Sequence, residues 1–158
     1  MRNVTIAATL AVVLTMAACG GDHSGHEAAP GLGALGHAAD PDEADREIEI
    51  EALDSLGFSP ADIEVKVDEV VTFVITNSGE AVHEFVIGDE QAQMEHADHM
   101  ESEGGGGMIH DEPNAVSLEA GETKEITWYF TDEGTTLIGC HEPGHYDGGM
   151  KGTISVSS

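Results

Sequence analysis

The sequence predicts an all-β domain, a Greek-key sandwich of about eight strands in two antiparallel sheets. Ile48 and Ile50 alternate with glutamates, the period-two pattern of a half-buried strand. Residues 70–76 are almost all β-branched or aromatic, as in a strand buried on both faces, and residues 77–79 (Asn-Ser-Gly) follow as a turn. The other strands are predicted from short apolar runs between turn residues, at 63–67, 82–87, 115–118, 122–130, 135–138 and 152–156.

The first 45 residues are predicted to serve export rather than folding. Residues 1–18 have a basic start and an apolar run that is too short to cross a membrane easily, which is typical of a signal peptide. The run ends in Met-Ala-Ala-Cys, similar to a bacterial lipobox, so Cys19 is the expected lipidation site. Cleavage near Ala18 without lipidation is the alternative. Residues 19–45 are rich in Gly, Ala, Asp and Pro and are predicted to form a flexible tether to a domain at 46–158.

Residues 89–112 interrupt the strand pattern and are interpreted as an insertion with a short helix at 91–100. Thioether and imidazole side chains together suit transient binding of Cu(I). The insertion therefore raises the hypothesis of a second, weaker copper site. The alternative is a flexible acidic loop whose methionines cover the sandwich. The candidate residues for the second site are Met94, His96, His99, Met100, Met108 and His110.

The chain is strongly acidic, with 31 Asp and Glu against 5 Lys and Arg and a formal net charge of −26. Such a surface repels phosphate backbones and anionic lipid headgroups, which excludes nucleic-acid binding and a basic membrane-surface protein. The expected partners are redox proteins with basic docking patches. The expected membrane contact is the N-terminal lipid alone.

One loop near the C-terminus contains the donor atoms of a metal site. Cys140, His145 and Met150 follow each other at spacings of five residues. A thiolate, two imidazoles and a weak axial thioether are the ligands of a blue copper site. The second imidazole must come from elsewhere in the fold, and His83 is the best candidate, because it lies on a strand directly after the turn at 77–79.

At these residues the sequence resembles the cupredoxins, the plastocyanin and azurin superfamily. The resemblance covers 46–158 and is strongest at 58–65, 76–85 and 140–150. It implies one type 1 copper, with His83, Cys140 and His145 in the trigonal plane and Met150 axial. Within the superfamily, the chain looks like the small exported bacterial cupredoxins associated with copper tolerance. One departure is Glu84, where many cupredoxins have an Asn whose amide ties the two ligand loops together.

Two functions are compatible with a cupredoxin that has one type 1 copper. The first is one-electron transfer between redox partners by an exported blue copper protein, lipid-anchored outside the cytoplasmic membrane or periplasmic. The alternative is an extracytoplasmic copper-tolerance protein that binds, buffers or oxidises copper. An enzyme is not expected: the His-x-His pairs of multicopper oxidases are absent from the sequence, and Gly144 stands where a binuclear copper centre needs a second cysteine.

Overall fold

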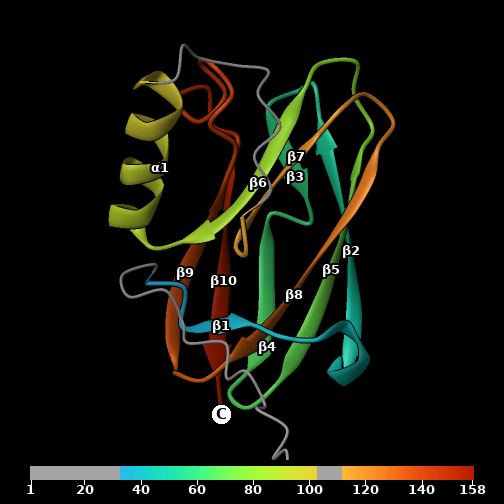
Figure 1. The fold of residues 1–158 in the computed structure, drawn as a ribbon, viewed down its shortest axis with the longest axis vertical. Coiled ribbons are helices and arrows are strands. Elements are labelled where there is room, and N and C mark those ends of the chain that lie inside the picture. Colours follow the sequence, from blue (N-terminus) through green and yellow to red (C-terminus); the bar gives the residue numbers. More distant parts are fainter. Residues whose placement is uncertain (1–32, 103–111) are drawn as a thin grey trace, which may run out of the picture.

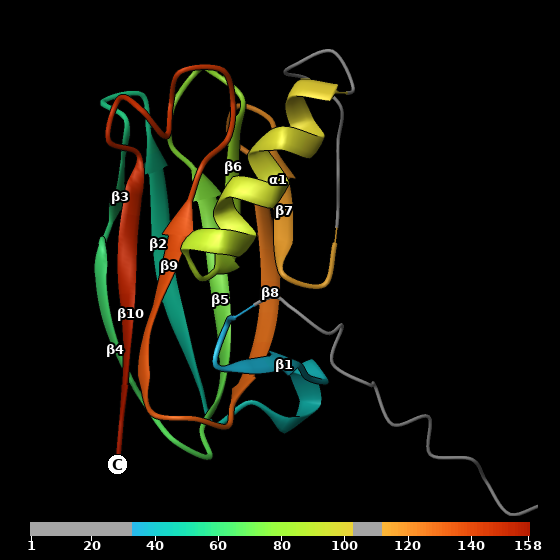
Figure 2. The same cartoon turned by 90° about the vertical axis from the view of Figure 1, so that its left-hand side faces the viewer.

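The computed structural model describes residues 33–102 and 112–158, which form a two-layer β-sandwich with one helix on its outside (Figures 1 and 2). The two sheets have five strands each within these residues, in the orders β1-β8-β5-β2-β3 and β4-β10-β9-β6-β7. The strands are β1 (Gly36–Ala38), β2 (Arg46–Leu53), β3 (Gly57–Ser59), β4 (Asp62–Lys66), β5 (Val70–Asn77), β6 (His83–Gly88), β7 (Ala115–Leu118), β8 (Thr123–Phe130), β9 (Gly134–Gly139) and β10 (Lys151–Ser157). A 3₁₀ turn (Pro41–Glu43) precedes β2, and α1 (Glu90–Ser102) follows β6.

The sandwich is confirmed, but the sheets are mixed rather than purely antiparallel. β2 pairs with β5 in parallel, as β4 does with β10. Between β2 and β5 the chain passes through β3 in the first sheet and β4 in the second, and β5 then returns beside β2 in the same direction. The two extra strands, β1 and β3, have three residues each, too few for alternation to reveal them in the sequence.

The predicted tether is wrong for residues 33–45, which pack on the sandwich. β1 adds to the edge of the first sheet by pairing with β8. Ala34 is buried, and its carbonyl accepts a hydrogen bond of 3.2 Å from the indole Nε1–H of Trp128. Glycine and alanine suggested a tether by composition, but small residues also let this segment approach the edge closely. The predicted signal peptide, Cys19 and residues 20–32 lie outside the described residues.

The core between the sheets is aromatic and lies close to the strand that begins with His83. Phe85 packs edge-to-face on Phe58 with ring centroids 5.5 Å apart, and its ring lies 5.9 Å from that of Phe73. Trp128 and Phe130 extend the same buried cluster. Phe85 is fully buried two residues after His83, so core packing fixes the position of the strand that carries this imidazole.

Both faces of β6 are buried, because α1 covers the face opposite the core (Figure 2). Phe85 and Ile87 belong to the core cluster, whereas Glu84 and Val86 alternate with them and point to the helix side. Within the described ranges, no helix is both long and apolar enough to span a bilayer.

Candidate metal centre

Strand pairing brings the predicted ligands to one end of the sandwich. β6 and β9 are antiparallel neighbours, with Val86 opposite Gly139, so the start of β6 lies beside the end of β9. His83 is the first residue of β6, and Cys140 directly follows β9. The loop then turns back and reaches β10 immediately after Met150. His83 and the loop from Cys140 to Met150 therefore lie at the same end of a hydrogen-bonded strand pair.

Three donor atoms converge at this end. Nδ1 of His83 lies 3.3 Å from Nδ1 of His145, and Sγ of Cys140 lies 3.4 Å from the same His145 nitrogen. All three donor atoms lie within 4.8 Å of one another, a spacing that allows one metal ion to contact them together. His83 and Cys140 are fully buried, and the ring of His145 is partly exposed. The structure thus brings His83 to the C-terminal loop, as the sequence analysis expected.

Met150 ends the ligand loop. Its side chain is fully buried, its N–H donates to the His145 carbonyl at 2.9 Å, and its carbonyl accepts from the Cys140 N–H at 3.1 Å. The residue before it is Gly149, whose φ of +104° is a conformation that residues with a Cβ rarely adopt. Backbone hydrogen bonds therefore hold Cys140, His145 and Met150 in one compact turn before any ion binds.

A carboxylate that the sequence analysis missed orients His83. Oδ1 of Asp54 lies 3.2 Å from Nε2 of His83, so the ring donates there and turns Nδ1 toward Cys140 and His145. Asp54 also accepts the backbone N–H groups of Glu80 (2.9 Å) and Ala81 (3.2 Å). These two bonds, first that from Glu80, lower the pKa of Asp54 and keep it ionised. Nothing in the sequence marked this residue, which lies in the turn after β2.

The thiol of Cys140 is protonated at neutral pH in the metal-free protein. Burial raises its pKa to about 12, against the opposing effect of hydrogen bonds from the backbone N–H groups of Glu84 and Glu142. The Glu84 N–H lies 3.3 Å from Sγ. A metal ion must therefore displace a proton from this sulfur, and the same N–H groups then stabilise the thiolate.

Glu84 joins the two ligand segments, although many cupredoxins use an Asn at this position. Its Oε2 accepts the backbone N–H of His141 at 3.2 Å, while its own N–H donates to Cys140. The strand with His83 and the loop with Cys140 are thus joined by two hydrogen bonds through one residue. The side chain is 1% exposed, so solvent does not compete for either bond.

The insertion residues do not form one cluster. Ala92, His96 and Met100 follow a four-residue spacing and define the buried face of α1, whereas Met94 and His99 are exposed. Gln93 is buried on this face as well, so the face turned to the sheet includes His96 but not His99, three residues further on. Met108 and His110 lie outside the described residues.

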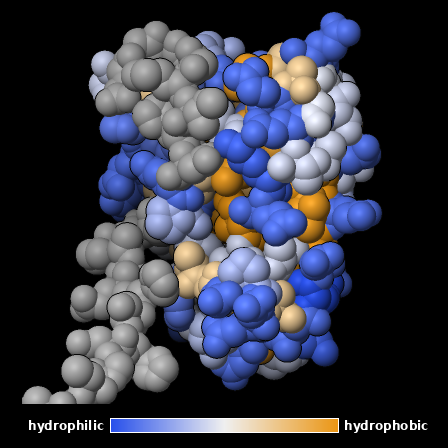
Figure 3. All heavy atoms as spheres, turned by 45° about the vertical axis from the view of Figure 1, so that its right-hand side comes forward, coloured by the Kyte–Doolittle hydropathy of each residue, from blue (hydrophilic) through white to orange (hydrophobic). Residues whose placement is uncertain are grey.

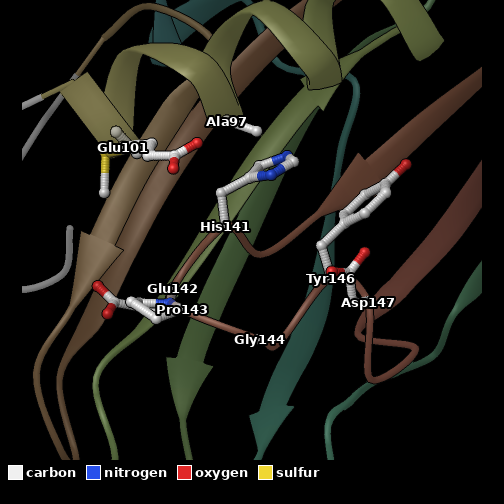
Figure 4. Close-up of a pocket in the computed structure, with 9 residues that line it drawn as sticks. Ala97, Glu101, His141, Glu142, Pro143, Gly144, Tyr146 and Asp147 are labelled. Carbon is white, nitrogen blue, oxygen red and sulfur yellow. The ribbon is translucent and has the colours of Figure 1, made fainter.

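His141 lies in the loop between Cys140 and His145 but outside the group of converging donor atoms. Its ring is half-buried beneath α1 and points toward Ala97 (Figure 4). It stacks on Tyr146, with centroids 4.6 Å apart, and Nε2 lies 2.7 Å from Oε1 of Gln93. Burial lowers the pKa of His141 to about 4, so the ring is neutral at pH 7.

Comparison with known proteins agrees with this geometry. The profile described as copper binding proteins, plastocyanin/azurin family, matches residues 44–157. The chain belongs to the plastocyanin/azurin family of copper-binding proteins. It is 35% identical to the copper-resistant cuproprotein CopI of Pseudomonas aeruginosa, with 82% of this chain and 87% of that protein covered. It is 36% identical to CopI of Rubrivivax gelatinosus, with 87% and 82% covered.

Solved structures show the same fold. Reduced auracyanin from Roseiflexus castenholzii superposes with a TM-score of 0.62 at 27% identity, covering 73% of this chain and 99% of that one. Auracyanin B gives a TM-score of 0.63 at 25% identity, covering 77% and 95%. The donor set of this family member fits copper: His83, Cys140, His145 and Met150 are arranged as a type 1 site, with soft sulfur and imidazole donors.

Proposed function

We propose that this protein is an exported type 1 copper protein that carries single electrons. His83, Cys140 and His145 are the proposed equatorial ligands and Met150 the axial one. The convergence of the three equatorial donor atoms within 4.8 Å carries the proposal. When bound, copper supplies a Cu(II)/Cu(I) couple. The chain contributes a ligand cage that backbone hydrogen bonds fix in advance, so little rearrangement accompanies a change of oxidation state.

The surface suits transient contact with a basic partner. The face in Figure 3 is mostly hydrophilic, with apolar side chains in small areas between polar ones. The net charge of −26 would speed association with a cationic docking patch and make it sensitive to salt. The partly exposed ring of His145 is the proposed point of electron transfer, since it is the most exposed of the three converging ligands. In this role the protein passes electrons to a partner and converts no substrate of its own.

The first test is spectroscopic. Cu(II) added to the full chain is expected to give an intense thiolate-to-copper band in the visible spectrum and a type 1 electron paramagnetic resonance signal. One equivalent should saturate both signals, and reduction should bleach them reversibly. A colourless protein that binds zinc in preference to copper would refute the proposal. Rapid, salt-sensitive reduction by a basic redox protein would support the carrier role directly.

The names of the relatives favour a second function, copper tolerance outside the cytoplasm. Both CopI proteins are described as copper-resistant and are aligned over more than four-fifths of this chain. We propose that the electron carrier and the copper-handling role share the one site. Export by the signal peptide and anchoring through Cys19 belong to the same proposal, because tolerance of this kind acts where excess copper first accumulates.

A deletion strain separates the two functions. If tolerance is the role, cells lacking the gene are expected to respire normally but to stop growing at a copper concentration that the parent survives. The wild-type gene should restore growth, and a His83→Ala gene should not. Impaired respiration with unchanged copper sensitivity would instead identify the carrier role alone.

A further inference from the structure

A second group of polar side chains lies between α1 and β6, on the face of β6 opposite the core. Glu84 is 1% exposed and His96 is 8% exposed. Oε1 of Glu84 and Nε2 of His96 lie 3.5 Å apart, and among the described residues Nε2 has no hydrogen-bond partner. The imidazole nitrogen is thus buried and faces a carboxylate at ion-pair distance, but it makes no hydrogen bond to it.

This arrangement is costly for a purely structural pair. A buried polar atom left without a hydrogen-bond partner destabilises the folded state. Within the part of the chain that the structure describes, no Lys or Arg forms an ion pair with Glu84. A metal ion between the two atoms would satisfy both. Their separation matches the edge of about 3.4 Å between two ligands that each lie roughly 2.1 Å from a tetrahedral ion.

A soft donor lies on the same buried helix face as His96, and it borders a cavity. Met100 is one helical turn beyond His96 on the same buried face and is 5% exposed. Its side chain lines a cavity of about 670 Å³ between α1 and the Cys140 loop, together with His141, Glu142 and Glu101. Figure 4 shows this cavity with the carboxylates of Glu101 and Glu142 on one side and His141 on the other. The acidic lining attracts cations toward the helix.

His141 forms a wall of this site rather than one of its ligands. The amide nitrogen of Gln93 donates to the carbonyls of Val86 (3.0 Å) and Gly88 (3.4 Å), which directs the amide oxygen at His141. His141 therefore donates through Nε2 and cannot bind a metal with that nitrogen. Its ring centroid lies 5.3 Å from that of His96.

We propose that Nε2 of His96, Oε1 of Glu84 and the thioether of Met100 form a second copper site, which binds Cu(I). Imidazole and thioether select the cuprous ion, and the carboxylate balances its charge in the buried site. Of the six residues that the sequence suggested, the proposed site uses His96 and Met100, and Glu84 is added. This second site does not require copper in the type 1 site. Glu84 connects the two sites, because its N–H donates to Cys140.

The test counts copper while the type 1 site serves as an internal control. Cu(I) is titrated anaerobically into the full chain against bathocuproine disulfonate. The wild type is expected to hold one more Cu(I) than His96→Leu, and Met100→Leu, which keeps the packing volume, should weaken that extra equivalent at least tenfold. Met94→Leu and His99→Gln, on the exposed face of the same helix, are matched controls and should bind like the wild type.

The readouts separate this proposal from the proposed function. Each variant is also loaded with Cu(II) in a separate sample, because Cu(I) gives no thiolate-to-copper band. An intact band shows that the fold and the type 1 site are preserved. A missing band in the wild type would count against the proposed type 1 copper but not against the second site, which the Cu(I) count decides. If His96→Leu loses the band, its fold or its type 1 site is disturbed, and the second copper site is then judged from Met100→Leu. Unchanged Cu(I) stoichiometry and affinity in Met100→Leu and in a band-positive His96→Leu would overturn the second site. Loss of the extra equivalent in Met94→Leu or His99→Gln would do the same.

Discussion

Replacing Cys140 with serine is expected to abolish the thiolate-to-copper band and to weaken copper binding by more than about 100-fold, beyond what the loss of an outer-shell partner costs. The buried Sγ accepts hydrogen bonds from the backbone N–H groups of Glu84 and Glu142, and a serine oxygen can accept both. The fold should therefore survive, while the soft anionic donor is lost. Visible absorption and competition titration with a chelator measure the two effects.

The same variant tests the role of the thiol proton. With a pKa of about 12, Cys140 is protonated in the metal-free protein at pH 7, and copper must release that proton. Raising the pH lowers the cost of release, so the apparent affinity of the wild type should rise about tenfold between pH 7 and pH 8. Burial lowers the pKa of His145, which is therefore already neutral in this range. The serine variant should lose most of the pH dependence.

Cys19 provides the matched control, since it is the other cysteine of the chain. Cys19→Ser should leave the band, the affinity and the pH dependence unchanged. A band that persists in Cys140→Ser and disappears in Cys19→Ser would place the copper elsewhere. A wild-type affinity independent of pH would contradict the displacement of a buried thiol proton.

The ligand set could be predicted from sequence because type 1 chemistry needs rare donors. Cys140, His145 and Met150 lie in one short loop, and few strands begin with an imidazole as β6 does at His83. The orienting carboxylate could not be predicted in this way. Asp54 lies 29 residues from His83, and aspartate is common in turns for reasons unrelated to metals.

The parts of the fold that the sequence left hidden depend on tertiary contacts. The helix at α1 was expected from its composition, but its buried face was decided by the sheet beneath it, which took His96 and Met100 inward and left His99 outside. β1 was hidden for a similar reason. Its three residues have no strand pattern of their own and become a strand only by pairing with the edge of β8.

Truncating Phe85 to alanine is expected to lower the free energy of unfolding of the metal-free protein by about 3–5 kcal/mol, measured by urea denaturation. The ring is fully buried and contacts Phe58 and Phe73 at the centre of the sandwich, so its removal leaves a cavity that neighbouring strands cannot close. Met94→Ala, at a position 57% exposed, should change the free energy by less than about 0.5 kcal/mol.

The position of Phe85 gives the same variant a second consequence. Phe85 lies two residues after His83 on β6, and its packing determines where that strand begins relative to the Cys140 loop. Copper loading should therefore recover part of the lost stability, because an ion that binds only the folded state favours it by mass action. A loss below about 1 kcal/mol in the metal-free protein would show that hydrogen bonds at the loop, rather than core packing, hold β6 in place.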